Sequence, residues 1–264
     1  MSQGRIRVGT SGWSYKSWRG PFYPADMRQK DWLTHYATQF DTAEINATFY
    51  RLPSQAAVAA WREATPADFE FSWKASRFIT QAKKLRDPEE PLARVFAPMA
   101  ALGRKRGPTL FQLPPSLHLD LPRLGAFLAR LPPGRHTVEF RHPSWYAEPT
   151  LTMLADHDIA LCVSDHADAP APWERTASFA YVRCHGPTGR YAGTYPDKTL
   201  EHWADHIGCW AGDGDVYAYF DNDIGAAAPG DAMRLRERLG AFAVRPHDRS
   251  GTAPVVAGAT SAGA

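Results

Sequence analysis

The sequence predicts an α/β fold: a single (β/α)8 barrel of the TIM type with parallel strands, formed by residues 1–243. Eight short runs with strand character recur along the chain, and segments with helical periodicity separate most of them. Parallel neighbours need such crossover connections, and eight βα repeats in about 240 residues match this barrel in number and size. A doubly wound open sheet uses fewer strands, and its usual G-x-G-x-x-G motif is missing after the first run.

The strand candidates are short apolar or alternating runs, most of them followed by Gly, Pro or Ser residues that favour turns. They are Arg5–Gly9, Thr42–Asn46, Glu70–Lys74, Thr109–Leu113, Thr137–Arg141, Ile159–Ser164, Phe179–Cys184 and Val216–Phe220.

The helix candidates lie between these strands. They are Asp31–Gln39, Gln55–Ala64, Pro91–Arg104, a segment between Asp120 and Pro132, Pro149–His157, Lys198–Trp210 and Pro229–Leu239. Ser54 and Asp120 are residues of the kind that caps a helix N-terminus. The connection Asp165–Ser178 contains too much proline for more than one turn of helix. Residues 244–264 lose periodicity, become rich in Ala and Gly, and are expected to form a flexible C-terminal tail.

Composition narrows the class of protein. The 264 residues carry 30 Lys and Arg against 28 Asp and Glu, a formal net charge of +2, which argues against nucleic acid as a partner. No apolar run approaches the roughly 18 residues of a membrane span, and the N-terminus has no signal-peptide core. Cys162, Cys184 and Cys209 are too few and too scattered for a disulfide framework. We therefore expect a cytoplasmic protein that acts on a small molecule.

Polar residues gather where the predicted strands end, which is where barrels of this type build their active sites. Side chains two apart on a strand share a face, so Glu139 and Arg141 point into the barrel if Val138 and Phe140 face the helices. Charge inside a barrel must be paired or used. A structural ion-pair plug is the alternative. It needs only one or two pairs, whereas here polar groups follow all eight strands.

Three of these residues are candidate catalytic groups. Glu44 and Glu139 would be the general acid and base, and Lys74 a base or electrostatic group whose pKa neighbouring cations would lower. The predicted substrate-binding residues are Trp13, Asn46, Gln112, Arg141, Trp145, Asp165, Arg183, His185 and Asn222. The two arginines would clamp an anion, because a guanidinium binds a carboxylate or phosphate through two hydrogen bonds. The sequence requires no metal or cofactor.

Two loops add to this site. The first, Gly12–Lys30, contains five aromatic residues, of which Trp13 is the best candidate to bind a substrate and Trp18, Phe22 and Tyr23 fit a hydrophobic plug better. Trp145 and Tyr146 would extend the aromatic wall. The other, His185–Arg190, lies where many barrels bind phosphate, and Tyr191–Tyr195 would continue it as a lid; a simple Gly/Pro turn is the competing interpretation.

Seven motifs follow one another from about Arg5 to Leu239. They are Gly9–Tyr15 (GTSGWSY), Ala43–Tyr50 (AEINATFY), Phe71–Lys74 (FSWK), Phe111–Pro115 (FQLPP), Val138–Trp145 (VEFRHPSW), Tyr181–Gly186 (YVRCHG) and Tyr219–Asp223 (YFDND). Together they resemble the YecE-like family, a domain-of-unknown-function family that is number seventy-two in its series. The resemblance implies a TIM-type barrel and no established reaction. The last motif departs from the family's usual Y-F-N-N at Asp221, which adds a charge or a metal ligand there.

The leading functional hypothesis is an enzyme that acts on a small anionic or sugar-like molecule, such as one bearing a phosphate or a carboxylate, by general acid–base or electrostatic catalysis. A metal-assisted isomerase or phosphodiesterase is the second hypothesis, using the acidic and histidine side chains Glu44, Glu139, Asp165, His185 and Asp221. A non-catalytic module that binds a nucleotide or single-stranded nucleic acid is the third. The leading hypothesis requires five charged residues to converge in one water-accessible cup: Glu44, Lys74, Glu139, Arg141 and Arg183.

Overall fold

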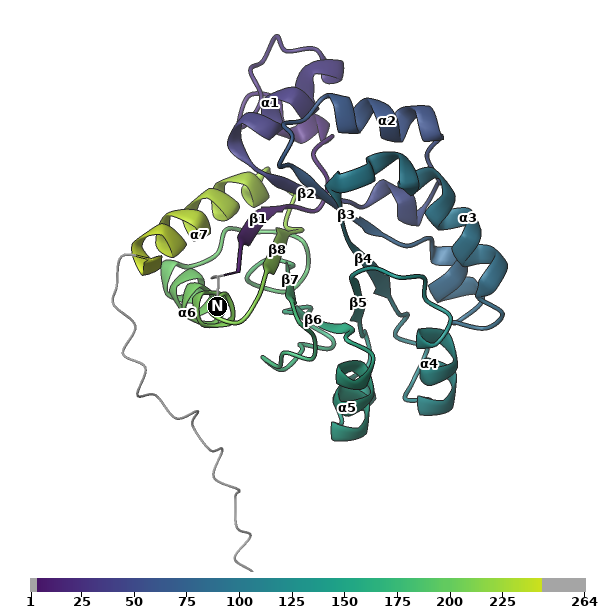
Figure 1. The fold of residues 1–264 in the computed structure, drawn as a ribbon. Coiled ribbons are helices and arrows are strands. Elements are labelled where there is room, and N and C mark those ends of the chain that lie inside the picture. Colours follow the sequence, from purple (N-terminus) through teal and green to yellow (C-terminus); the bar gives the residue numbers. More distant parts are fainter. Residues whose placement is uncertain (1–3, 244–264) are drawn as a thin grey trace, which may run out of the picture.

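All eight predicted strands are present in the computed structural model, which describes residues 4–243 (Figure 1). The strands are β1 Ile6–Thr10, β2 Thr42–Ile45, β3 Glu70–Lys74, β4 Arg106–Gln112, β5 His136–Glu139, β6 Ala160–Ser164, β7 Ala180–Cys184 and β8 Val216–Phe220. The helices are α1 Trp32–Gln39, α2 Gln55–Glu63, α3 Glu89–Met99, α4 Leu121–Leu128, α5 Glu148–Asp156, α6 Asp197–Trp210 and α7 Ala227–Ala243. The predicted tail, residues 244–264, lies outside the described residues.

The strands form one parallel sheet that nearly closes on itself. Its order runs from β1 through β8, β7 and the remaining strands back to β2, so each strand lies beside its neighbour in sequence. The seam between β1 and β2 is joined by a single bridge, Ser11 with Glu44, and by a 2.7 Å hydrogen bond from the Gly12 amide to the Glu44 carbonyl. Helices surround the sheet in Figure 1. The predicted TIM-type (β/α)8 fold is confirmed.

Several boundaries differ from the prediction by a few residues, and two of these differences are informative. The predicted helix Pro91–Arg104 is shorter, because α3 ends at Met99 and a 3-10 segment follows to Lys105, with Gly103 at φ 57° inside it. A positive φ is incompatible with a continuing α-helix, and glycine adopts it without strain. β5 ends at Glu139, so Arg141 follows the strand instead of belonging to it. The proline-rich connection between β6 and β7 contains no α-helix among the described residues, as predicted.

The barrel interior is divided into layers. Near the strand starts, Arg7 pairs with Glu70 at 2.8 Å. Tyr217 of β8 belongs to the same layer and donates to Glu70 at 2.7 Å. Above this layer lie the buried Tyr181 and Tyr219, of which Tyr219 hydrogen-bonds Thr42 and Ser72 at 2.6 and 2.8 Å. Outward-facing side chains such as Val138 pack under the helices and form the hydrophobic core. The tyrosine layer therefore separates the base of the barrel from the charged groups at its mouth.

The aromatic loop after β1 covers one side of the barrel. Trp18 and Tyr23 are fully buried, and Tyr23 stacks on Trp32 of α1 with ring centroids 4.8 Å apart. Phe22 packs edge-on against Trp18 and Tyr23. These three side chains form the hydrophobic plug that the sequence favoured. No helix within residues 4–243 combines the length and apolar character needed to cross a bilayer.

Candidate active site

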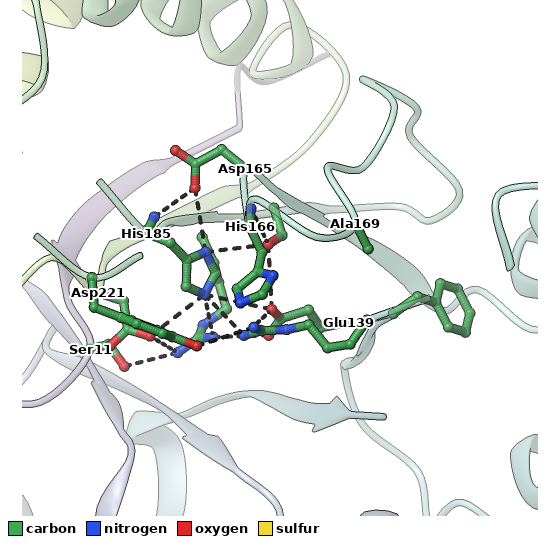
Figure 2. Close-up of polar contacts among 12 residues, drawn as sticks. Ser11, Glu139, Asp165, His166, Ala169, His185 and Asp221 are labelled. Atoms are coloured by element: carbon green, nitrogen blue, oxygen red, sulfur yellow. Dashed lines mark hydrogen bonds and ion pairs between the residues drawn. The ribbon is translucent and has the colours of Figure 1, made fainter. Parts of the chain in front are cut away.

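One arginine organises the charged groups at the barrel mouth. Arg183 points inward from β7 and is completely buried. Its guanidinium contacts three carboxylates from different strands: Glu44 at 2.8 Å, Glu139 at 2.9 Å and Asp221 at 2.9 Å. Figure 2 shows Ser11, Glu139 and Asp221 converging with His185 on this centre. Burial by itself would lower the pKa of Arg183, but the three carboxylates raise it well above its ordinary value. The guanidinium is therefore a permanent charge.

The carboxylate oxygens of the two buried glutamates accept hydrogen bonds from this arginine and from neighbouring donors. Glu44 accepts hydrogen bonds from Ser11 at 2.5 Å and from Tyr181 at 2.6 Å, in addition to Arg183. Glu139 accepts from Arg183 and pairs with Arg141 at 2.6 Å. Burial would raise the pKa of Glu139, yet Arg141 and Arg183 outweigh it and hold this pKa well below its usual range.

A second group of side chains extends the cluster toward β6. Arg141 donates to His185 Nε2 at 3.1 Å and to the Tyr191 hydroxyl at 3.1 Å. Arg183 contacts the same His185 nitrogen at 3.1 Å, so both arginines lie on the Nε2 side of the ring, and the other ring nitrogen is Nδ1. That nitrogen faces Asp165 at 3.4 Å, and Asp165 also accepts the backbone amide of His185 at 2.6 Å (Figure 2). The histidine orientation is thus fixed from both sides.

A cavity of about 700 Å3 opens beside this cluster, at the C-terminal ends of β1, β2, β3 and β8. Its polar lining residues are Ser14, Asn46, Lys74, Asp221 and Asp223. Its aromatic lining residues are Trp13, Tyr15, Tyr50, Trp61 and Tyr191. The volume lies within the range of small-molecule sites, and the mixture of flat apolar faces with a few polar groups is typical of them.

Lys74, the last residue of β3, lies at the boundary between the cluster and the cavity. It is 6% exposed, and its ammonium lies 4.2 Å from the centre of the Phe49 ring. Within residues 4–243 its Nζ makes no hydrogen bond and no ion pair. Burial first, and then the positive charge of Arg183, lower the pKa of Lys74 to about 8. Its amine is therefore available at the cavity wall in both protonation states near neutral pH.

Two aspartates after β8 supply the acidic side of the cavity. Asp221 forms an ion pair with Arg183 at 2.9 Å. Asp223 is partly buried, and burial together with the negative charge of Asp221 raises the pKa of Asp223 to about 6. A lysine with a lowered pKa and an aspartate with a raised pKa thus line one cavity, which is the pattern expected where protons are transferred.

Aromatic side chains shape the cavity wall. Trp13 packs edge-on against Trp61 of α2 with ring centroids 5.6 Å apart. The Tyr15 hydroxyl donates to the Ser11 carbonyl, which fixes its ring beside the seam between β1 and β2. Tyr191 has φ 65° and is held by Arg141 and by the Ile224 amide, which donates to its carbonyl. Hydrogen bonds therefore fix Tyr15 and Tyr191 in the cavity wall.

The structure separates the predicted site residues into three groups. Trp13, Asn46 and Lys74 line the cavity. Five belong to the buried charge cluster: Glu44, Glu139, Arg141, Arg183 and His185. The remaining four lie outside the cavity lining: Gln112, Trp145, Asp165 and Asn222. The five charged residues of the leading hypothesis do converge, but of these only Lys74 reaches the cavity wall.

Glu44 and Glu139 do not fit the acid–base roles assigned from sequence. Both are 0% exposed, and their oxygens are engaged by Arg183 and other donors. The arginines do not fit the anion clamp either, because carboxylates of the chain already occupy their donors. The physical reason is that inward-pointing charges of opposite sign neutralise each other when they meet in a barrel too narrow to hydrate them.

Three predicted binding residues have structural roles instead, and a fourth lies outside the cavity lining. Trp145 is fully buried, stacks on Phe140 at 4.8 Å and donates to the Leu117 carbonyl, so it belongs to the core and does not extend an aromatic wall. Asn222 donates to the Gly193 carbonyl and to Asp231, joining the loop after β7 to α7. Gln112 and Asp165 lie outside the cavity lining, and Asp165 holds His185 as described.

Both glycine amides of the segment His185–Arg190, after β7, are engaged within the chain. The Gly186 amide donates to the Tyr195 hydroxyl and the Gly189 amide to the Gly186 carbonyl. A Cβ at Gly186 would meet the Ala192 carbonyl oxygen at 2.4 Å, so this glycine serves a close approach within the loop. These contacts favour the turn interpretation, although Tyr191, at the start of the predicted lid, lines the cavity.

Sequence reasoning missed Tyr50 and Trp61 in the aromatic wall, and it did not select either aspartate as a substrate-binding residue. Asp221 and Asp223 stand directly after a strand, which is the signal that identified the other polar residues. Tyr50 and Trp61 carry no such signal, because they come from the segment after β2 and from α2. Within residues 4–243 no group of three or more His, Cys, Asp or Glu side chains has an arrangement suited to a metal ion.

The fold and the site define a TIM-type barrel protein with a polar cavity at the C-terminal ends of its strands. The family described as "Protein of unknown function DUF72" matches residues 7–253, and the chain belongs to this family. The resemblance found in the sequence motifs is thereby confirmed. The family's function is uncharacterised, so its name assigns no reaction to the cavity.

Named relatives agree with this assignment. UPF0759 protein YecE of Escherichia coli (strain K12) is 32% identical over 145 residues, which cover 54% of this chain and 51% of that relative. The chain thus spans about half the length of the E. coli relative that it matches. UPF0759 protein YunF of Bacillus subtilis (strain 168) is 24% identical over 277 aligned residues, covering 89% of this chain and 94% of YunF.

Solved structures share the fold. A DUF72 family protein from Thermotoga maritima superposes with a TM-score of 0.81 at 27% identity, covering 89% of this chain and 99% of that one. A DUF72 family protein from Enterococcus faecalis, 18% identical, has a TM-score of 0.78 over 95% of this chain and 99% of its own. The barrel is therefore common to relatives whose sequences have diverged widely.

Proposed function

We propose that the protein is an enzyme that acts by general acid–base and electrostatic catalysis on a small sugar-like molecule bound in the cavity. Lys74 and Asp223 are the proton-transferring groups, and Asp221 sets their charge environment. The single observation that carries this proposal is the unpaired Lys74 amine at the wall of a cavity of about 700 Å3.

Proton transfer is supported by the charges around the cavity. A general acid or base works best when its pKa lies near the operating pH. The pKa of Lys74, lowered to about 8, and that of Asp223, raised to about 6, bracket neutrality. At pH 7 the lysine is mostly charged and the aspartate mostly ionised, but a fraction of each is in the other form, so each group can donate or accept a proton.

The lining favours a polyhydroxyl substrate over a strongly anionic one. Lys74 is the lone cation among the residues described as lining the cavity, and two aspartates share that lining with it. Asn46 lines the cavity and its Oδ1 has no hydrogen-bond partner within residues 4–243, which makes it the candidate acceptor for a substrate hydroxyl group. The Trp13 ring offers a flat apolar face of the kind that packs against a sugar ring.

The other two hypotheses receive less support from the geometry. Metal-assisted chemistry would need Glu44 and Glu139, whose oxygens are bound to protein donors around Arg183. Binding of single-stranded nucleic acid would need arginines free to meet phosphates, whereas Arg141 and Arg183 are buried and paired. A net charge of +2 adds little attraction for a polyanion.

A thermal-shift screen tests the proposal. Monosaccharides, sugar alcohols and sugar acids are added to the purified protein, and compounds that raise its melting temperature are then tested for turnover by NMR. The Lys74→Met and Trp13→Ala variants should lose the shift caused by the same compounds. Lys198→Met, which changes an exposed lysine on α6, should keep it. Equal shifts in Lys74→Met and the unmodified protein would contradict the assignment.

A further inference from the structure

We propose that Lys74 forms a reversible imine with the carbonyl group of a small hydroxy-aldehyde or hydroxy-ketone bound in the cavity. This inference rests on the proposed function and names the substrate class of the same site. An open-chain sugar carries both a carbonyl and several hydroxyl groups, so it meets the chemistry of the lining described above.

The first support is that the Lys74 amine is not engaged by other groups. Two other lysines are occupied in this way: Lys105 donates to backbone carbonyls of Arg62 and Thr65, and Lys83 pairs with Asp87 at 3.2 Å. An ammonium held in this way must lose its partner before its nitrogen can attack a carbonyl carbon. The Nζ of Lys74 has no such contact among the described residues, and it is the one amine of the cavity lining.

The second support is the environment of the nitrogen. A buried lysine beside another cation is a recognised arrangement for an amine nucleophile, because both factors favour the neutral form. Burial and Arg183 act in this direction on Lys74, and with a pKa of about 8 roughly a tenth of the amine is neutral at pH 7. Arg183 cannot itself relieve this effect, since Glu44, Glu139 and Asp221 keep it charged and in place.

The chemical step is balanced by groups at the site. The neutral Lys74 nitrogen attacks the carbonyl carbon, a carbon–nitrogen bond forms, and the proton released from nitrogen passes to the carbonyl oxygen to give a carbinolamine. Loss of water then breaks the carbon–oxygen bond and needs a proton donor, for which Asp223, with a pKa of about 6, is the candidate. The products are a protonated imine and water, and addition of water reverses the step. No oxidant or reductant is consumed.

Reductive trapping tests this inference. The full-length protein is incubated at pH 7 with D-glyceraldehyde or dihydroxyacetone and sodium cyanoborohydride, which reduces the protonated imine to a stable secondary amine. Intact-mass measurement and peptide mapping then give the rate of labelling at each lysine. We expect Lys74 to be labelled at least tenfold faster than the exposed Lys198. Lys74→Arg, which keeps the charge but cannot form an imine, should lose this fast adduct, whereas Lys198→Arg should retain it.

Formaldehyde serves as the matched control probe because it carries no hydroxyl group for the lining to recognise. The ratio of labelling at Lys74 to labelling at Lys198 should be smaller with formaldehyde than with glyceraldehyde. Labelling of Lys74 no faster than that of Lys198 with both sugars would overturn the imine. If the same sugars raise the melting temperature without labelling Lys74, the imine fails while the acid–base function stands; if they do neither, both proposals fail.

Discussion

The barrel mouth contains two adjacent regions that treat charge in opposite ways. Around Arg183 every carboxylate is matched by a donor, and the side chains are almost completely buried. In the wall of the cavity, the Lys74 ammonium lies over the Phe49 ring and makes no hydrogen bond or ion pair with the rest of residues 4–243. The difference indicates that the paired region serves as a rigid support, whereas the unpaired region is where a small molecule would meet reactive groups.

The largest expected effect comes from removing the centre of the paired region. Arg183→Met should lower the free energy of unfolding by about 3–5 kcal/mol, because Glu44 and Glu139 would be left buried without their counter-ion. Urea unfolding followed by circular dichroism measures this change. A loss below about 1 kcal/mol would mean that the two glutamates find other partners, and the contrast between the two regions would then weaken.

The ionisation of Glu139 should make the stability of the paired region depend on pH. The folded-state pKa of Glu139 lies well below its usual range, so its ionised form stabilises the fold above the ordinary glutamate pKa, and this contribution is lost as the pH falls. The difference in free energy of unfolding between the unmodified protein and Glu139→Gln should therefore shrink on acidification below about pH 4.5, by up to about 1.4 kcal/mol per pH unit. Urea titrations at pH 7, 4 and 3 provide the measurement; a constant difference contradicts it.

Lys74 differs from Glu139 because folding disfavours its charged form, although its contribution to stability also rises with pH. Because its folded-state pKa is lowered to about 8, the folded protein loses this proton at a pH where the unfolded chain still holds it. Stability from this group should then rise between about pH 8 and pH 10, by less than about 1.4 kcal/mol per pH unit. The groups acting on the ammonium are Arg183, Glu139, Asp221 and Glu44.

Lys74→Met is the matched variant for that measurement. It should remove the rise in stability and leave the protein at pH 7 as stable as the unmodified protein or slightly more so, since no ion pair is broken. Urea unfolding at pH 7.5 and 9.5 compares the two proteins. An unmodified protein that loses stability relative to the variant over this interval would show that Lys74 is paired in solution.

The smallest effect is expected at Asp223. Burial and the charge of Asp221 raise its folded-state pKa to about 6, so its contribution to stability decreases as the pH rises through the interval from about 4 to 6. Asp223→Asn should therefore be more stable at pH 7 than the unmodified protein, by about 1 kcal/mol or less because the carboxyl is only partly buried. Thermal unfolding at pH 4 and pH 7 reveals this as a shift that appears only at the higher pH.

Much of the fold could be predicted from local patterns, whereas the allocation of site residues could not. Alternation placed Glu139 and Arg141 on the inner side, and Val138 and Phe140 do pack outward. The same pattern cannot tell on which side of Arg183 the cavity opens, because that depends on how the loop after β1 packs on α1. Nor does it show that a tryptophan after a strand, such as Trp145, turns into the core.

The weak joint of the barrel has a consequence for any molecule that enters the cavity. β1 and β2 meet through one bridge, and the cavity lining includes residues from just beyond both strands, among them Trp13 and Asn46. A small molecule that contacts both residues would connect the ends of β1 and β2, which backbone pairing joins through one bridge. Binding of the small molecule would then stabilise the closed barrel, and in the unliganded protein the seam between β1 and β2 should open before the other strand pairs.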